Sequence, residues 1–473
     1  MSSANTYDLI VIGTGPAGEK AAVKAAYFGK KVAIIEKEKC YGGAGINTGT
    51  IPSKTLKESA LYYSDKYDTG IYGHYRVLDG QTTIQDFLFR KNVVIESLEQ
   101  EVLKNLERHD VKLFHGIASF EDKNTVLIDG DDGEIRITSD YVPIATGSYP
   151  FHPENIDFDG IIVHDSDSIL NIMRIPDSLC IVGAGVIGCE YATIFGVMGC
   201  KVYLVNNSDK ILPFLDDEIA QALIAQMHED GVNILFNASI DEMIIPEHVG
   251  GDIQIRLKDG MVFDVDMFLF AAGRSGSTKA LNCEQVGIDL GKREAIVVNE
   301  QYQTSQKNIY AAGDVIGFPA LASTSMDQGR VAVSHIFDIH DSDALPKIFP
   351  YGIYTIPEVS MLGITEEQAI AEGMNYLVGC AHHSKVPHGR IMGAKFGVLK
   401  IIVSKDDMVI RGVHIMGRLA SELIHYGLAV VEAEKTVNEI VSTVFNYPTL
   451  HDLYKYACFD ALGNLSGHKI KDF

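Results

Sequence analysis

The chain has 473 residues, which is too long for one hydrophobic core, so it predicts about two to four domains with room to enclose a large cofactor. Hydrophobic residues make up 46% and charged residues 22%, an ordinary globular balance that favours neither a disordered nor a membrane protein. The formal net charge of -23 argues against general nucleic-acid binding, because so acidic a surface repels phosphate backbones.

The N-terminal segment and the cysteines bear on where the protein works. The first apolar run has no basic segment before it and leads into a glycine-rich turn, so we expect no signal peptide. No window holds about eighteen uninterrupted apolar residues, so we expect no membrane span. The seven cysteines are odd in number, scattered and without a Cys-x-x-Cys pair, which is typical of reduced thiols and predicts a cytoplasmic protein. They are Cys40, Cys180, Cys189, Cys200, Cys283, Cys380 and Cys458.

A strand, a glycine turn, a helix and a second strand are predicted in residues 7–36. In the turn GTGPAG, Gly13 permits the sharp bend, Gly15 lets the backbone approach a pyrophosphate, and Gly18 allows the helix to pack on the strand. A pyrophosphate would rest against free N–H groups at the positive end of that helix. Glu36, at the end of the second strand, is predicted to accept hydrogen bonds from ribose hydroxyls.

The same order of elements returns in residues 179–206, with a second glycine turn 170 residues after the first. Gly183, Gly185 and Gly188 repeat the spacing of the first three glycines and are predicted to bind a second dinucleotide. Alternating strands and helices of this kind predict parallel sheets with right-handed crossovers, so the expected fold class is α/β.

The ribose position of the second copy is occupied by Asn206, which is not an acid. A carboxylate there would favour NAD by bonding the 2′-hydroxyl, and an arginine would favour NADP. An amide can donate to a phosphate or accept from a hydroxyl, which indicates that both coenzymes bind. The alternative is that Asn206 is only a turn residue and that selectivity lies elsewhere.

Three further segments, 144–151, 268–276 and 308–317, place small residues directly after an apolar strand. A carboxylate beside a phosphate would be costly, so we expect the aspartate of the third segment to bind a neutral hydroxyl, such as that of a flavin ribityl group, although capping a helix is the more common use of such a residue. The turn residues predicted to line a cofactor site are Thr146, Gly147, Gly273, Gly313 and Asp314.

The rest of the sequence predicts one long helix and, toward the C-terminal end, a change to short strands followed by helices. Residues 85–110 look helical, and 111–143 look like short strands. From about residue 347, short strands are followed by an amphipathic segment at 418–434 and a last helix near 449–462. This predicts a third domain of the α+β class.

Together these motifs resemble the pyridine nucleotide-disulfide oxidoreductase family, in the family's order and over nearly the whole chain. The resemblance rests on both glycine turns, Glu36, GGAGINTGTIPSK at 42–54, IATG at 144–147 and AAGDV at 311–315. It implies two Rossmann-like domains arranged as in glutathione reductase, an FAD cofactor, NAD(P) as substrate and a homodimer. The implied division is 1–150 with 280–346 for FAD binding, 151–279 for NAD(P) binding and 347–473 for dimerisation.

The sequence departs from that family where thiol chemistry would occur. Disulfide reductases of the family resemble GGxCxNxGCIPSK, whereas this chain has Gly45 and Thr50 at the two cysteine positions. Neither side chain forms a thiolate or a disulfide. The family's C-terminal HPTxxE, which moves protons to thiols, is replaced by YPTLHD with Tyr447 at the histidine position, and tyrosine is a poor base near neutrality. We therefore expect no redox-active cysteine pair.

Within the family, the chain is most similar to the soluble, FAD-containing pyridine nucleotide transhydrogenases. This resemblance implies that hydride passes from NADPH to flavin N5 and on to NAD in ping-pong order, without a disulfide. It implies that Lys54 lies near N5, that Glu190 pairs with it, and that Thr50 contacts the cofactor. It is carried by 47–58, 205–218, 352–358 and 445–449.

Two alternatives stay open. The first is an NAD(P)H:quinone or dye reductase that uses the same flavin. The second is a non-catalytic, redox-sensing flavoprotein, which would have little use for Lys54 and Glu190. The histidines at 382, 383 and 388 have neither nearby cysteines nor a regular ligand spacing, so no metal site is predicted.

Overall fold

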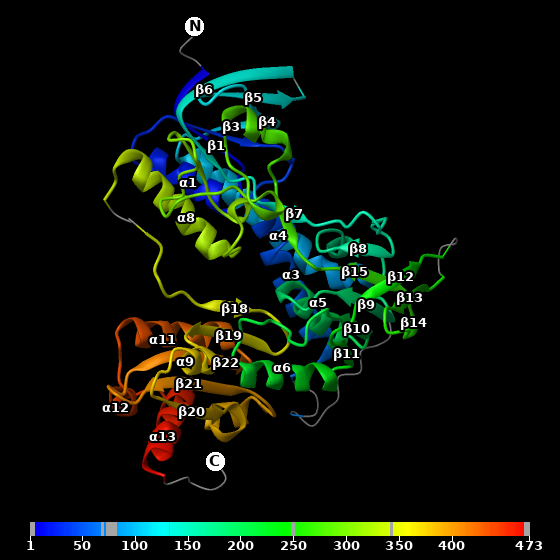
Figure 1. Ribbon diagram of the computed structural model, residues 1–473, viewed down its shortest axis with the longest axis vertical. Helices are drawn as coiled ribbons and strands as arrows, with labels where there is room; N and C mark the ends of the chain where they lie inside the picture. Colours follow the sequence, from blue (N-terminus) through cyan, green and yellow to red (C-terminus); the bar gives the residue numbers. More distant parts are fainter. Residues whose placement is uncertain are drawn as a thin grey trace.

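The computed structural model describes residues 5–67, 71, 83–131, 133–246, 251–340 and 344–467. Over these residues the chain forms three large sheets with helices packed on them. In Figure 1 the first sheet lies at the top, the second at the right and the third at the bottom. The mixed α/β class predicted from the sequence is confirmed by this arrangement.

The first sheet has the order β3 (Lys112–His115), β2 (Val32–Glu36), β1 (Thr6–Ile12), β6 (Gly133–Ile144), β5 (Thr125–Gly130) and β4 (Ile117–Phe120), with β17 (Ile309–Ala311) paired to β6. Its central strands are parallel, as predicted, whereas β4, β5 and β6 form an antiparallel meander. The helix α1 (Pro16–Tyr27) follows β1 and packs against α8 (Ala322–Phe337). The glycine turn between β1 and α1 therefore lies at the carboxyl edge of a parallel sheet, where such folds bind ligands.

The second sheet is entirely parallel and repeats this plan. Its order is β11 (Val232–Leu235), β10 (Lys201–Val205), β9 (Ser178–Val182), β15 (Met267–Phe270) and β8 (Val163–Asp165). The helices α5 (Val186–Val197) and α6 (Asp217–Glu229) pack on it. Smaller elements beside it are β12 (Ile240–Ile244), β13 (Ile253–Leu257), β14 (Val262–Val265), the pair β7 (Ser148–Pro150) and β16 (Arg274–Gly276), and the short helix η2 (Ser168–Asn171). The short helices η3 (Lys279–Leu281) and α7 (Cys283–Val286) contact β4 of the first sheet, and η4 (Lys292–Glu294) and η5 (Asp314–Ile316) contact β16.

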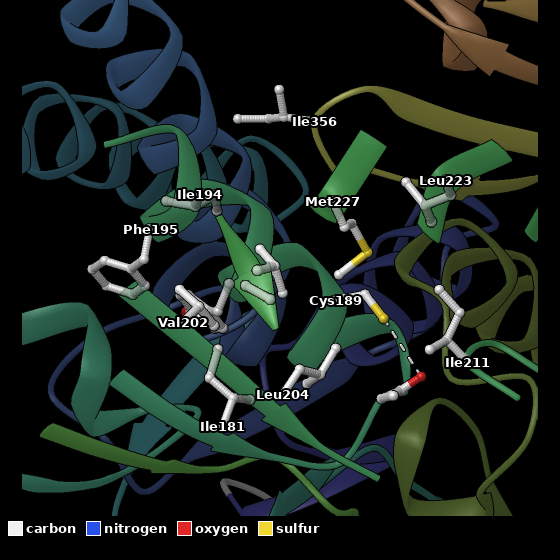
Figure 2. Close-up of a cluster of buried hydrophobic side chains, with 14 of the residues drawn as sticks. Ile181, Cys189, Ile194, Phe195, Val202, Leu204, Ile211, Leu223, Met227 and Ile356 are labelled. Carbon is white, nitrogen blue, oxygen red and sulfur yellow. Dashed lines mark hydrogen bonds between the residues drawn. The ribbon is translucent and has the colours of Figure 1, made fainter. Parts of the chain in front are cut away.

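One hydrophobic cluster fixes α5 between the second sheet and the C-terminal part of the chain (Figure 2). Phe195 on the helix and Ile181 in the sheet are both buried, and Ile356, which belongs to the C-terminal part, joins the same cluster. Because every residue of α5 from Gly188 to Gly196 is buried, its apolar character all round is explained by contacts on every side. The second glycine turn is thus attached to a rigid core.

Two helices connect the first sheet to this core. The helix α3 (Thr50–Ser64) follows the short α2 (Gly43–Asn47) and packs against α5 and against α4 (Ile84–Arg108). We expected Lys54, which follows Pro52, in the first turn of a helix, and the structure places it just beyond that turn. The helix begins at Thr50, because a proline is tolerated within the first turn, where its missing N–H would have no helical partner. Lys54 consequently projects from the second turn.

The third sheet is antiparallel, with the order β18 (Tyr351–Ile353), β19 (Glu358–Gly363), β22 (Ile410–Gly417), β21 (Val398–Ser404) and β20 (Tyr376–His382). The helix α11 (Ala420–Glu432) packs on β19 and β22, and α13 (Asp452–Ser466) packs on β20 and β21. The remaining helices are α9 (Glu366–Ala371), η6 (His383–Lys385), α10 (Pro387–Ile391) and α12 (Val437–Ser442). Among the helices described, none has the length and apolar character to cross a membrane.

Candidate active site

A cavity of about 1560 Å³ lies between the two glycine turns and is lined by loops from all three sheets. Every predicted site residue except two contributes to its wall: Gly13, Gly15, Glu36, Thr50, Lys54, Thr146, Gly147, Gly183, Gly185, Glu190, Asn206, Gly273, Gly313 and Asp314. The exceptions, Gly18 and Gly188, stand behind the turns. A Cβ on Gly18 would lie 1.9 Å from the Gly13 carbonyl oxygen, and one on Gly188 would lie 1.8 Å from that of Gly183. They set how closely each helix approaches its turn.

Both turns leave helix N–H groups facing the cavity. Gly15 and Gly185 occupy the N-cap positions of α1 and α5, and neither helix has a side-chain cap. Gly13 and Gly183 both adopt positive φ, of 105° and 103°, which a side chain would strain. An uncapped N-terminus behind such a turn is suited to bind a phosphate group.

Glu36 is held in place by Thr14, a residue that the sequence analysis did not single out. Its Oε2 accepts hydrogen bonds from the Thr14 backbone N–H at 3.0 Å and from Thr14 Oγ1 at 2.6 Å, and its Oε1 accepts from the Glu38 N–H at 3.0 Å. A carboxylate offers about four acceptor positions, so about one remains for a ligand hydroxyl. Thr14 Oγ1 also accepts from the Gly42 N–H at 3.1 Å, which links the turn to the start of α2.

The wall on the side of the first sheet has the features expected of an FAD site. Thr146 Oγ1 is buried without a hydrogen-bond partner although its residue lines the cavity, so it is available to a ligand. A Cβ on Gly43 would lie 2.7 Å from Gly15 Cα, which shows how closely the two backbone segments approach. Burial raises the pKa of Asp314, and Ser148 Oγ donates to its Oδ2 at 3.2 Å. The residues present therefore fit a bound dinucleotide with polar groups along its length.

Arg274 joins this wall to the second sheet, and the sequence analysis did not assign it a role. Its Nε donates to Ser148 Oγ at 2.9 Å, and one terminal nitrogen donates to Asp167 Oδ1, also at 2.9 Å. The signal was present in the sequence, because a cation inside the segment 268–276, directly after the small residues at 271–273, has to find acceptors nearby.

Lys54 and Glu190 meet inside the cavity, from α3 and α5. The Lys54 Nζ lies 2.8 Å from Glu190 Oε1 and 2.7 Å from Oε2. The Glu190 side chain is 4% exposed and that of Lys54 is 24% exposed, so the acid is buried and the ammonium faces the cavity. Ser53 Oγ and the Tyr354 N–H also donate to this carboxylate, at 3.3 and 3.0 Å. Four donor contacts hold one carboxylate and, through it, fix the position of the Lys54 ammonium group.

A second buried ion pair, Lys57 with Glu358, is linked to the first one through the ring of Tyr354. The Lys57 Nζ lies 2.5 Å from Glu358 Oε1, and Oε2 of the same carboxylate accepts from the Ser421 N–H at 3.1 Å and from Ser421 Oγ at 2.7 Å. The Tyr354 ring lies between the two ammonium groups, with its centroid 5.0 Å from Lys54 Nζ and 5.7 Å from Lys57 Nζ. Burial by itself would raise the pKa of Glu358, but Lys57 and Ser421 outweigh it and hold that pKa below its ordinary value.

Gly45 and Thr50, which stand where the family's disulfide reductases have their redox cysteines, both line the cavity. All seven cysteines fall within the described residues and are free. Cys40 also lines the cavity, and burial, followed by the nearby Glu99, Glu38 and Glu36, raises the pKa of its thiol. A raised pKa keeps a thiol protonated and unreactive near neutrality.

Asn206 lines the cavity at the end of β10, but its amide is already in use. Its Nδ2 donates to the Ser208 carbonyl oxygen at 3.1 Å and to the Lys210 carbonyl oxygen at 2.9 Å. The donor role that we expected toward a phosphate is therefore taken by the turn at 206–210.

One residue of the C-terminal part, Tyr447, lies apart from this cavity. Tyr447 is 78% exposed and does not line it. Within the described ranges, no group of three or more His, Cys, Asp and Glu side chains is arranged to hold a metal ion.

Comparison with known proteins agrees with this geometry. Residues 7–329 match the family model described as pyridine nucleotide-disulphide oxidoreductase, and residues 349–458 match its dimerisation domain. The chain belongs to the pyridine nucleotide-disulphide oxidoreductase family. The predicted family is thus confirmed, and the matched dimerisation domain supports the predicted homodimer.

Relatives within this family cover nearly the whole chain. A soluble pyridine nucleotide transhydrogenase from Mycobacterium bovis is 40% identical over 97% of this chain and 98% of that protein. One from Erwinia tasmaniensis is 39% identical over 98% of this chain and 100% of that protein. Among solved structures, the Cu(II) complex of the HOCl-induced flavoprotein disulfide reductase RclA from Escherichia coli is 28% identical over 96% of this chain and 99% of that chain, with a TM-score of 0.87. LpdA from Mycobacterium tuberculosis is 25% identical over 95% and 99%, also with a TM-score of 0.87. These neighbours confirm the glutathione reductase-like fold.

Proposed function

We propose that this protein is an FAD-dependent transhydrogenase that moves hydride between NADPH and NAD. The relatives named as soluble pyridine nucleotide transhydrogenases match it from end to end at about 40% identity. The structural observation that carries the proposal is the Lys54–Glu190 ion pair, which lies in a cavity lined by both glycine turns. FAD, when bound, supplies a ring that accepts hydride from one nicotinamide coenzyme and returns it to another.

The chain's own residues position the reactants. The first turn, with Gly13, Gly15 and Glu36, holds FAD, and the second turn, with Gly183 and Gly185, holds the nicotinamide coenzyme. Thr50, Thr146, Gly147, Gly273, Gly313 and Asp314 complete the cofactor walls. The proposed domains are residues 1–150 with 280–346 for FAD, 151–279 for NAD(P) and 347–473 for dimerisation.

Lys54 supplies the positive charge at the reaction centre, and Glu190 aims it. A cation fixed before the reaction stabilises negative charge as it develops, because no reorganisation is needed at that moment. The backbone N–H of Tyr354 keeps Glu190 oriented, so that the ammonium faces the cavity. Both coenzymes use the same site in turn, which predicts ping-pong kinetics.

We also propose that no redox disulfide takes part. Gly45 and Thr50 carry no sulfur, and the thiol of Cys40 stays protonated. The free state of all the cysteines supports placing the reaction in the cytoplasm, where thiols stay reduced.

Anaerobic stopped-flow measurements test the function directly. The purified protein is reduced with NADPH and then mixed with a thio-analogue of NAD, whose reduction has its own absorbance. Rapid bleaching of the flavin followed by rapid reoxidation on adding the analogue is the expected result. Bleaching that only a quinone or oxygen reverses would replace the transhydrogenase with a quinone or dye reductase. Absence of bleaching by either coenzyme would leave a non-catalytic flavoprotein.

A further inference from the structure

The turn that follows β10, residues 206–210, lies at the second dinucleotide site, where Asn206 and Asn207 line the cavity. Asn206 is 7% exposed, and its backbone is fixed by bonds from its N–H to the Leu235 carbonyl oxygen and from the Ala238 N–H to its own carbonyl oxygen, both at 2.9 Å. The Asn237 N–H donates to the Ser208 carbonyl oxygen at 3.1 Å. The turn is therefore held from both sides before any coenzyme arrives.

The orientation of the Asn206 amide follows from its partners. Its Nδ2 contacts two carbonyl oxygens, those of Ser208 and Lys210, and each of them only accepts hydrogen bonds. A flipped amide would place oxygen against oxygen, so the hydrogens must point into the turn. The group left for a ligand is Oδ1, to which no donor is assigned among the described residues. Asn206 consequently presents an acceptor to the ribose.

An acceptor distinguishes the two coenzymes. The 2′-hydroxyl of NAD can donate a hydrogen bond to Oδ1. The 2′-phosphate of NADP carries about two negative charges and offers acceptor oxygens, so it gains nothing from Oδ1 and is repelled by it. Without a cation nearby, this turn disfavours NADP.

The cation in the turn is engaged elsewhere. Residues 206–218 contain a single basic side chain, that of Lys210, and four carboxylates. Its Nζ lies 2.7 and 2.9 Å from the two carboxylate oxygens of Asp217, in the first turn of α6. The Asp217 N–H is itself bonded to Glu367 Oε1 at 3.1 Å, which ties this end of α6 to α9. The acid that holds Lys210 therefore has a fixed position.

We propose that the second dinucleotide site is selective for an adenosine ribose with a free 2′-hydroxyl, and that Asp217 determines this selectivity by withholding Lys210 from a 2′-phosphate. NADP(H) then binds the same site more weakly than NAD(H). This inference rests on the proposed function for its meaning in turnover. It concerns ligand binding, however, and can be measured without any hydride transfer.

The test uses two small ligands that differ in one group. Adenosine 5′-monophosphate and adenosine 2′,5′-bisphosphate share the adenine, the ribose and the 5′-phosphate, and each is titrated into the FAD-loaded full-length protein by calorimetry. In the wild-type protein the monophosphate is expected to bind at least as tightly as the bisphosphate. Tighter binding of the bisphosphate would overturn the proposal.

Asp217→Asn releases Lys210 while keeping the shape of the side chain. We expect it to tighten bisphosphate binding about two- to fivefold, the range that an exposed ion pair is worth, and to leave the monophosphate unchanged. Adding Lys210→Ala to that variant is expected to abolish the gain. Asp209→Asn is the matched control, because it removes the same charge from the same turn, where Asp209 is hydrogen-bonded to Ser208 while the Lys210 ammonium is hydrogen-bonded to Asp217.

The outcomes separate three cases. An equal gain in Asp209→Asn and Asp217→Asn would overturn the role of Asp217, since only the general field would then matter. No gain in Asp217→Asn, or a gain that survives Lys210→Ala, would overturn it as well. Failure of hydride transfer between coenzymes would remove the proposed function, while the ratio of the two binding constants would still decide the selectivity of the site.

Discussion

The buried pair of Lys57 and Glu358 behind the cavity makes a prediction whose size follows from the contacts. Lys57→Met keeps most of the apolar stem but removes the ammonium group. Glu358, with its side chain 11% exposed, then loses the 2.5 Å partner of Oε1, while Ser421 still donates to Oε2. Removing one partner of a buried ion pair costs about 3–5 kcal/mol, because an unpaired charge is left behind. We expect the free energy of unfolding to fall by that amount.

A double-mutant cycle isolates the cause of that loss. Lys57→Met combined with Glu358→Gln has no unpaired charge, so it is expected to be about 2 kcal/mol more stable than Lys57→Met alone. The assay is urea unfolding followed by circular dichroism, at fixed protein and FAD concentrations. Lys39→Met is the control, because its side chain is 85% exposed and its loss should change stability by less than about 0.5 kcal/mol. If Lys57→Met stays within about 1 kcal/mol of the wild type, or if the two single costs simply add, the pair does not hold the wall as argued.

Three further predictions concern the reaction, the cofactor and acid stability. Lys54→Met is expected to slow flavin reduction by NADPH about a hundredfold with FAD retained, since one preorganised charge is worth about 3 kcal/mol. Stopped-flow absorbance measures the rate of flavin reduction, and Lys54→Arg should restore much of that rate. An unchanged rate in Lys54→Met would remove the role assigned to Lys54. Thr14→Val removes the Oγ1 bonds to Glu36 and Gly42, so FAD should bind the apoprotein about tenfold more weakly in a fluorescence titration; wild-type affinity would contradict this. Burial lowers the pKa of His383 to about 4, whereas the pKa of an unfolded histidine is about 6.5. Between these two pH values the unfolded chain binds a proton that the folded chain does not, so the free energy of unfolding falls as the pH drops. His383→Gln should remove about 2 kcal/mol of the loss in unfolding free energy between pH 6.5 and 5, and an unaltered pH slope would show that His383 is not its source.

The sequence predicted those parts of the fold whose signals are local. An apolar strand, three glycines and a following helix are neighbours along the chain, so both turns and their sheets could be recognised from about thirty residues each. The predicted helix at 85–110 agrees with α4, and the predicted amphipathic segment at 418–434 agrees with α11. Family resemblance then supplied the order of the parts, and the match to the family model confirmed it.

The features that the sequence did not predict depend on contacts between distant residues. Lys57 and Glu358 are 301 residues apart, so no spacing rule links them. The amide of Asn206 was expected to be free, but whether it is free depends on which carbonyl groups the next four residues turn toward it. Lys54 was expected within the first turn of its helix, but α3 begins two residues before Pro52, because a proline is compatible with several positions in a first turn. The roles given to individual site residues stay predictions that the experiments above can test.

The state of the cysteines has a consequence for survival under oxidative attack. Hypochlorite, peroxides and alkylating agents act on thiolates, and burial raises the pKa of all seven cysteines, five of which are buried. Gly45 and Thr50 stand where the disulfide reductases of the family would present a reactive sulfur. Within the described residues, the cavity wall therefore presents to such reagents only the Cys40 thiol, whose raised pKa disfavours the thiolate.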